Sequence, residues 1–174
     1  MLQLIYGDAL QGVVEHELLT PHHLQLIYKL PAAVKNVFNN HYPFSIQSHQ
    51  SSSLINFDSN NKDVLYAVFY PEFVTVLLRV NGQLQTIQQF EFATPEDAVY
   101  HLLNLCQSFE TVAANTVLTV SGMIDIDSIL YQELFKYFQS VNCKVLPDNF
   151  KYTEAITQHP AHYFSHLFYC ASCV

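Results

Sequence analysis

Four residues near the end of the chain have the types and the spacing of a metal site: His162, His166, Cys170 and Cys173. They stand four, four and three positions apart along one face of a predicted C-terminal helix. Imidazole and thiolate groups are usual ligands of zinc. A helix rises about 1.5 Å per residue, so the set extends over about 16 Å and one ion cannot reach all four. His162 and His166 supply two ligands, and His159 or another chain would have to complete the site.

The same residues have a simpler interpretation as part of the core. An unreactive cysteine packs like a small hydrophobic residue, so we expect the helix to be buried. Cys170 and Cys173 also have the spacing of a redox CxxC motif, but such a motif needs a helix N-terminus to activate its thiol. These two cysteines stand at the end of the sequence instead. We therefore predict neither a metal nor a redox centre here.

No motif for phosphate binding or nucleophilic catalysis occurs elsewhere. The four glycines are far apart, and neither GxxxxGK[ST] nor GxGxxG is present. GxSxG and HExxH are absent as well. Asp125 and Asp127 resemble a pair of catalytic carboxylates, but a nuclease needs several acids from different elements around two metal ions. Asp127 is better interpreted as a helix N-cap. The sequence predicts no catalytic residue and no cofactor.

The composition is that of a folded domain with little charge. Half of the 174 residues are apolar and 13% are charged, against about 25% charged in an average protein. This content excludes intrinsic disorder. The net charge is −8 and the seven basic residues are scattered, so we do not expect nucleic acid as a partner. With 11 tyrosines and 13 phenylalanines, aromatic surface should stay uncovered, which predicts a protein partner or a homodimer.

No segment of the sequence indicates a membrane protein. The longest apolar runs are far shorter than the ~20 residues that span a bilayer. The first residues lack the basic start of a signal peptide. We therefore expect a cytoplasmic protein without membrane association, in which all four cysteines, Cys106 included, are reduced.

Residues 63–174 predict a regular mixture of strands and helices. Three strands are expected at Val64–Tyr70, Phe73–Val80 and Leu84–Phe92, and Asn81-Gly82 predicts a type I′ turn between the last two. Thr94 and Pro95 begin a helix. The remaining expected elements are a strand at Thr116–Val120, a helix capped by Asp127 or Ser128, and a strand at Cys143–Leu146. The order β-β-β-α-β-α-β is α/β with a mixed five-stranded sheet, as in a ribonuclease-H-like lobe.

The first 62 residues predict a smaller and incomplete unit. Possible strands lie at Leu2–Tyr6, His23–Leu30 and Phe44–Ile46, and Pro31 begins a helix that ends near Asn40. This is a β-α-β fragment, which cannot bury both of its faces alone. The polar stretch Asp58–Asp63 predicts the boundary, so we expect a partial first lobe at 1–62 and a complete lobe at 63–174.

Several short segments give the chain a resemblance to a bacterial family, domain of unknown function 3822. They are Val80–Leu84 leading into Phe90–Phe92, Pro95–Asp97 with Tyr100, Ser121-Gly122, His162–Phe164, and the earlier Tyr28–Pro31. The similarity covers most of residues 23–174. Members resemble actin-like proteins with two ribonuclease-H-like lobes, and usually have a longer first lobe than this chain. The resemblance implies the fold and a cytoplasmic location, and it implies no activity.

The actin-like resemblance raises the question of ATP binding. Such ATPases place an Asp and a Gly at the first hairpin of each lobe, whereas the turn at 67–73 contains neither. A second glycine-rich turn follows the fourth strand, where this chain offers Ser121 and Gly122 as its only candidate cofactor-binding residues. Side chains keep backbone N–H groups away from phosphates, so we expect no bound nucleotide.

We therefore expect a non-catalytic actin-like protein that acts as a protein-interaction or scaffold module. The alternative is a nucleotide-dependent switch or ATPase, in which a missing or partner lobe completes the site.

Overall fold

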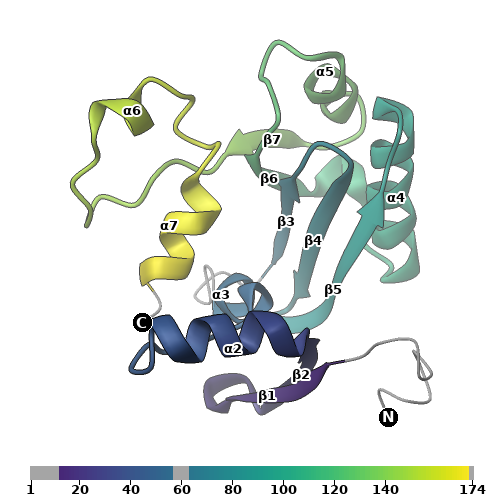
Figure 1. Ribbon diagram of the computed structural model, residues 1–174. Helices are drawn as coiled ribbons and strands as arrows, with labels where there is room; N and C mark the ends of the chain where they lie inside the picture. Colours follow the sequence, from purple (N-terminus) through teal and green to yellow (C-terminus); the bar gives the residue numbers. More distant parts are fainter. Residues whose placement is uncertain (1–11, 57–62, 173–174) are drawn as a thin grey trace. The chain divides into compact units, whose positions relative to one another are not determined.

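The computed structural model describes residues 12–56 and 63–172 (Figure 1). Contacts divide the chain into two units, Met1–Ser52 and Ser53–Val174. The boundary predicted at the end of residues 1–62 lies outside the described residues and stays a prediction. The strand predicted at Leu2–Tyr6 lies outside them as well. Among the described residues, no helix is long and apolar enough to cross a membrane.

The second unit contains the predicted mixed sheet of five strands. Its spatial order is β5-β4-β3-β6-β7 (Figure 1). The first three strands in sequence pair antiparallel, and β6 and β7 then join in parallel on the other side of β3. The strands are β3 (Val64–Phe69), β4 (Phe73–Val80), β5 (Gln83–Glu91), β6 (Val117–Gly122) and β7 (Ser140–Cys143). The predicted order of elements is therefore confirmed, although β7 lies earlier in the chain than the strand expected at Cys143–Leu146.

Local sequence explains the turn and the helix starts of this unit. Asn81 and Gly82 adopt φ values of 53° and 77°, a left-handed pair that suits a type I′ hairpin. Helix α4 (Pro95–Ser108) begins with a capping box between Thr94 and Asp97. The Thr94 hydroxyl accepts the Asp97 N–H at 3.2 Å, and the Asp97 carboxylate accepts the Thr94 N–H at 3.0 Å. Each cap satisfies N–H groups that the helix leaves open.

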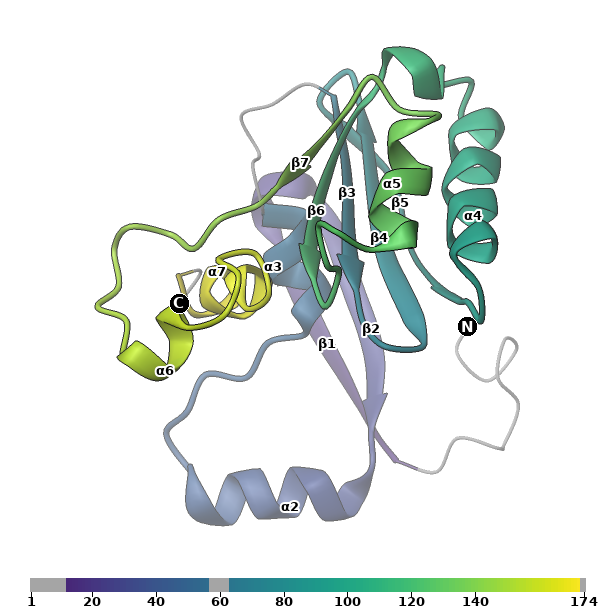
Figure 2. The ribbon, with the colours of Figure 1, turned by 90° about the horizontal axis from the view of Figure 1, so that it is seen from above.

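Helix α5 (Ile129–Phe135) begins at the second of the two predicted caps, because the Ser128 hydroxyl accepts the Tyr131 N–H at 3.2 Å. Helices α4 and α5 cover the same face of the sheet (Figure 2). Their apolar side chains share one buried cluster with alternate residues of the strands: Leu102 and Leu134 belong to it together with Ala67 and Val120. This layer is the hydrophobic core of the molecule.

The opposite face of the sheet carries helix α7 (Ser165–Ser172) (Figure 2). All six residues of β3 are buried, as expected for a central strand with both faces covered. A short helix, α6 (Glu154–Thr157), precedes α7 and was not predicted from the sequence.

The first unit is a β-hairpin followed by a helix. Strand β1 (Val13–Leu19) pairs antiparallel with β2 (Leu24–Leu30) through a 3-10 turn, η2 (Thr20–His22). Helix α2 (Ala32–His41) follows Pro31 as predicted.

Three features of this region differ from the predicted β-α-β fragment, and the first is that no strand was predicted at β1. Residues 44–46 form no strand: the Ser45 N–H donates to the Tyr42 carbonyl at 3.0 Å, which closes a turn. The described part of the unit is thus β-β-α. Helix α3 (Gln50–Asn56) then forms where no helix was predicted from the sequence.

Candidate functional site

Ser121 and Gly122 lie at the carboxyl end of β6, beside the end of β3. Ser121 is completely buried, and its hydroxyl shares a 2.6 Å hydrogen bond with the hydroxyl of Tyr66. Burial raises the pKa of Tyr66 well above its usual value. The Ser121 hydroxyl therefore belongs to a buried pair of hydroxyl groups that links β6 to β3.

Gly122 is required by the packing of the two strands. It has a φ of 83°, and a Cβ atom added to it would lie 2.1 Å from the Phe69 carbonyl oxygen. Its N–H donates to the His162 carbonyl at 3.0 Å, and the next N–H, that of Met123, donates to the Phe69 carbonyl at 2.8 Å. Both N–H groups that could face a phosphate are thus bound within the fold.

The hairpin between β3 and β4 offers a phosphate no better contact. The Tyr70 N–H donates to the Phe73 carbonyl at 2.9 Å, and the two rings stack with centroids 4.4 Å apart. A hollow of about 680 Å³ lies beside this turn, and the carboxylates of Glu72, Glu91 and Asp97 help to line it. Three carboxylates create a negative potential, which disfavours a polyphosphate.

The three described residues of the candidate metal site, His162, His166 and Cys170, do not form a metal-binding group. Helix α7 begins at Ser165, so His162 precedes the helix, contrary to the prediction that it lies on the helical face. His162 is buried, and its Nε2 lies 2.7 Å from the Ile124 carbonyl oxygen. Cys170 is half-buried on α7, whereas Cys173 lies outside the described residues. Residues 12–56 and 63–172 hold no group of three or more His, Cys, Asp or Glu side chains suited to a metal ion.

His166 has a different environment from that of His162. The residue is 4% exposed, and its ring meets the Tyr70 ring edge to face, with centroids 5.5 Å apart. Its Nδ1 atom has no hydrogen-bond partner in the part of the chain that the structure describes. Burial lowers the pKa of His166 to about 4, so the ring is neutral at physiological pH.

A buried arginine on the same face of the sheet was missed by the sequence analysis. Arg79 on β4 is 2% exposed, and its Nη2 donates to the Ile55 carbonyl at 2.6 Å. The signal was present in the sequence, because Arg79 is the only charged residue of the apolar run Phe73–Val80. A buried guanidinium needs polar partners, and here a backbone carbonyl supplies one.

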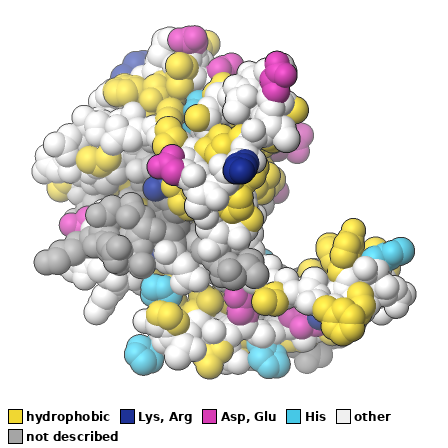
Figure 3. Space-filling view, turned by 90° about the vertical axis from the view of Figure 1, so that its left-hand side faces the viewer, with side chains coloured by type: hydrophobic (Ala, Val, Ile, Leu, Met, Phe, Trp, Pro, Cys, Tyr) yellow, Lys and Arg dark blue, Asp and Glu magenta, His cyan; other side chains and the backbone are white. Residues whose placement is uncertain are grey.

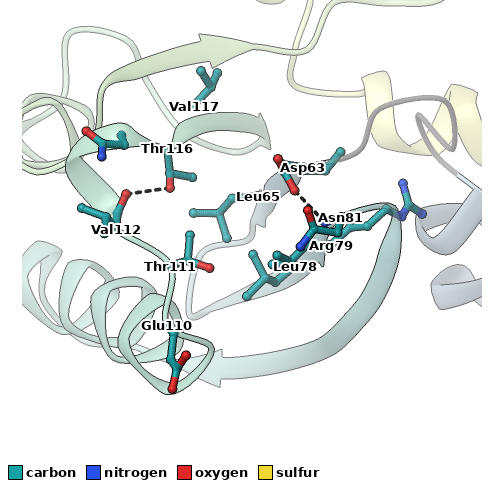
Figure 4. Close-up of a pocket in the computed structure, with 13 residues that line it drawn as sticks. Asp63, Leu65, Leu78, Arg79, Asn81, Glu110, Thr111, Val112, Thr116 and Val117 are labelled. Atoms are coloured by element: carbon teal, nitrogen blue, oxygen red, sulfur yellow. Dashed lines mark hydrogen bonds between the residues drawn. The ribbon is translucent and has the colours of Figure 1, made fainter.

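A second hollow, of about 440 Å³, lies at the amino ends of β3 and β6 (Figure 4). The Asp63 carboxylate accepts the Asn81 N–H at 2.7 Å, and the Thr116 hydroxyl donates to the Val112 carbonyl at 2.9 Å. Figure 4 shows Glu110 and Thr111 on the same side of the hollow as the end of α4. The lining contains no nucleophile beside a general base, so it forms a polar recess rather than a catalytic constellation.

Structural comparison defines the class of fold. The structure is similar to a crystal structure, at 1.85 Å resolution, of a Bacteroides thetaiotaomicron VPI-5482 protein with an actin-like ATPase fold and unknown function. The TM-score is 0.76 at 21% identity, and the match covers 98% of this chain but only 64% of that one. The AlfA filament bound to AMPPNP matches with a TM-score of 0.40 at 12% identity, over 67% of this chain and 39% of that chain. This chain has an actin-like fold.

The chain belongs to the family described as protein of unknown function (DUF3822), which matches residues 3–141. The predicted family is thus confirmed, although the match covers residues 3–141 and not the expected 23–174, so it does not include His162–Phe164. A comparison with curated proteins finds no match. A shared fold does not carry an activity with it, so function has to be argued from the residues of this chain.

Proposed function

We propose that this chain is a non-catalytic, protein-binding member of the actin-like fold class. The observation that carries the proposal is the apolar surface of the first unit. Helix α2 contains no buried residue, although it carries three large apolar side chains. We call these side chains and those that follow them the α2 surface: Val34, Val37, Phe38, Tyr42, Phe44 and Ile46.

The α2 surface has the chemistry of a protein-binding site. Phe44 is 99% exposed and Ile46 is 78% exposed, and Figure 3 shows hydrophobic side chains gathered over this part of the molecule, at the lower right. A hollow of about 640 Å³ in the same unit is lined by Tyr28, Phe38 and Tyr42 among others. Contiguous exposed apolar surface of this kind usually marks a binding site, and the hollow accommodates an aromatic or aliphatic side chain of the partner.

The internal hydrogen bonds at the end of β6 support a role without nucleotide. Ser121, Gly122 and Met123 already use the groups that would contact a phosphate. We place the module in the cytoplasm, in keeping with the free thiols of Cys106, Cys143 and Cys170.

Nucleotide binding is tested by following the melting temperature of the full natural protein with Mg-ATP and Mg-ADP. Ligand at a hundredfold its dissociation constant adds about 2.7 kcal/mol to the free energy of unfolding. That gain corresponds to a rise of roughly 5–10 °C in melting temperature. We expect no rise with either nucleotide. A rise of this size, abolished by Ser121→Asp, would replace the proposal by the nucleotide-dependent switch.

Partner binding is tested with the double variant Phe38→Ser/Phe44→Ser, expressed with a tag in the native host. Its matched control is Tyr100→Ser, which removes an aromatic ring that is 63% exposed on α4 in the other unit. We expect a defined protein to be captured with the wild type and the control and to be lost with the double variant. Capture that is the same for all three would contradict a role for the α2 surface.

A further inference from the structure

Four aromatic rings line the hollow of about 640 Å³ in the first unit, which we call the aromatic recess. They belong to Tyr28 on β2, to Phe38 and Tyr42 at the end of α2, and to His49 just before α3. The rings form two pairs: the centroids of Tyr28 and His49 lie 4.8 Å apart, and those of Phe38 and Tyr42 lie 6.3 Å apart. Among the described residues, no lysine, arginine, aspartate or glutamate lines the recess.

His49 adds no positive charge to the aromatic recess at physiological pH. Burial lowers the pKa of His49 below its usual value, although the nearby Glu17 acts in the opposite direction. The Ser51 N–H donates to Nδ1 of His49 at 3.1 Å, so the neutral ring carries its proton on Nε2. This ring therefore does not repel a cation.

Two carboxylates lie beside the aromatic recess, on the face of the hairpin that Tyr28 occupies. Glu15 is paired with Tyr28 across β1 and β2, and residues paired in this way point to the same face of a sheet. Glu17 stands two positions further along β1 and points to that face too. Its Oε2 accepts the His49 N–H at 3.0 Å. The Tyr28–His49 wall of the recess is thus next to both carboxylates.

One cation, Lys35, lies close to these carboxylates. Its Nζ is 2.9 Å from Oε1 of Glu15 and 3.3 Å from Oε1 of Gln47. The Glu15–Lys35 pair is close to neutral, so Glu17 sets the sign of the potential. The pKa of Tyr28 has the same dependence: burial raises it most, both carboxylates raise it further, and Lys35 opposes them with the smallest effect. The recess is therefore both aromatic and at negative potential.

Aromatic rings attract cations through their quadrupole, and a carboxylate nearby adds to the attraction. We propose that the aromatic recess binds the side chain of an arginine or a lysine of the partner protein. The aliphatic stem of either residue packs against the rings, and its charged end lies towards Glu17. The inference rests on the proposed function and deepens it, because it names the chemistry of the partner: a basic side chain among the apolar residues that cover the α2 surface.

The charge of the whole chain favours the same class of partner. A protein with a net charge of −8 attracts a basic segment over a longer range than these contacts reach. Salt screens that attraction. Binding of the basic side chain should therefore weaken as salt is added, whereas binding of a neutral apolar side chain should not.

The test uses two synthetic peptides and the full chain labelled with ¹⁵N. Acetyl-Leu-Arg-Leu-amide carries a positive charge, and the same peptide with citrulline in place of arginine has nearly the same shape without the charge. Each is titrated into the protein up to millimolar concentration at low salt and followed by NMR. We expect the arginine peptide to bind about tenfold more tightly than the citrulline peptide, with the largest shift changes at residues 42–50.

Two variants each remove one feature of the aromatic recess. Tyr42→Leu removes a ring but keeps an apolar side chain at a position 61% exposed, and Glu17→Gln removes a charge but keeps an oxygen that accepts the His49 N–H. We expect each to reduce the preference for arginine over citrulline about threefold. Tyr42→Phe keeps the ring and should bind like the wild type. Glu72→Gln, the matched control, neutralises an exposed carboxylate of the other unit and should also bind like the wild type.

Equal affinity for the two peptides would overturn the inference, because a neutral group would then fill the aromatic recess equally well. Failure of both peptides to bind in the millimolar range would overturn it too. A preference that Glu72→Gln abolishes and Glu17→Gln keeps would place the peptide on the other unit, with the same result.

The inference and the proposed function can fail separately. If capture of a partner is lost with Phe38→Ser/Phe44→Ser but the arginine peptide has no preference, the inference fails and the proposed function stands. If the preference is found but capture is the same for the wild type and that double variant, the aromatic recess is a cation site and the proposed function fails.

Discussion

His166 makes the stability of this protein depend on pH in a way that one substitution removes. The ring is 4% exposed, its Nδ1 has no hydrogen-bond partner among the described residues, and burial lowers its pKa to about 4. In the unfolded chain a histidine has a pKa near 6.5. Between these two pH values the histidine binds a proton in the unfolded state and stays neutral in the folded state. The neutral His166 therefore makes its full contribution to the free energy of unfolding above pH 6.5, and this contribution is lost as the pH drops towards 4.

The size of the effect follows from the two pKa values. At pH 5 the unfolded histidine is almost fully protonated and the folded one is mostly neutral, which lowers the free energy of unfolding by about 2 kcal/mol relative to pH 7.5. The variant His166→Phe keeps a ring against Tyr70 and removes the proton-binding nitrogens. It also removes the buried Nδ1 that lacks a partner, so we expect the variant to fold.

Urea denaturation of the wild type and of His166→Phe, at pH 7.5 and at pH 5, measures this contribution. Other groups titrate over the same range, but they act in both proteins, and the difference between the two isolates His166. We expect the wild type to lose about 2 kcal/mol more than the variant. The control His159→Phe alters an exposed histidine and should behave like the wild type. Equal losses in the wild type and in His166→Phe would refute the assignment of a neutral, buried ring.

Three further substitutions test the contacts around the site and the start of α4. Ser121→Ala should lower the free energy of unfolding by about 1 kcal/mol because it removes the buried hydrogen bond to Tyr66, and the loss should be smaller in a Tyr66→Phe background in a double-mutant cycle. Gly122→Ala should destabilise far more than Gly82→Ala in thermal melts, since only the former brings Cβ against the backbone of β3; equal effects would rule out this close approach. Thr94→Ala should cost about 1 kcal/mol in chemical denaturation and the corresponding Ser variant almost nothing, and a loss with both would exclude the cap as the cause.

Most of the second unit follows from local sequence. The strand predicted at Phe73–Val80 has the bounds of β4, because a run of β-branched and aromatic residues is limited by a proline on one side and by Asn81-Gly82 on the other. The start of helix α4 was predicted equally well, from the cap residue Thr94 and from Pro95. In such segments local preference and tertiary packing favour the same structure.

The elements that were predicted with wrong bounds or missed are those whose position depends on contacts with other parts of the chain. Cys143–Leu146 has the stronger strand composition, but parallel pairing with β6 selects Ser140–Cys143. Strand β1 alternates weakly because it contains charged residues at Glu15 and Glu17, and it forms because β2 lies beside it. In α3, burial of Leu54 and Ile55 outweighs the low helix propensity of three serines.

The candidate site shows a similar division between sequence and structure. The position of Ser121 and Gly122 at the end of β6 was predictable, because a glycine follows a buried strand there. That their hydrogen-bonding groups already have partners within the fold was not predictable. The partner groups on Tyr66, Phe69 and His162 lie about fifty positions earlier in the chain or about forty positions later. A sequence pattern places a backbone turn, whereas long-range packing decides whether its hydrogen bonds remain available.

The central position of β3 has a consequence for how the chain folds. One side of β3 pairs with β4 through a short hairpin, whereas the other pairs with β6, so that Leu65 meets Leu118 about fifty residues later in the chain. Closing that larger loop is the slower step, because entropy is lost before the contacts form. The β3-β4-β5 meander therefore forms first and leaves the apolar edge of β3 open until α4 and β6 arrive. Refolding yield should fall with protein concentration during that interval, when an open strand of one molecule meets that of another.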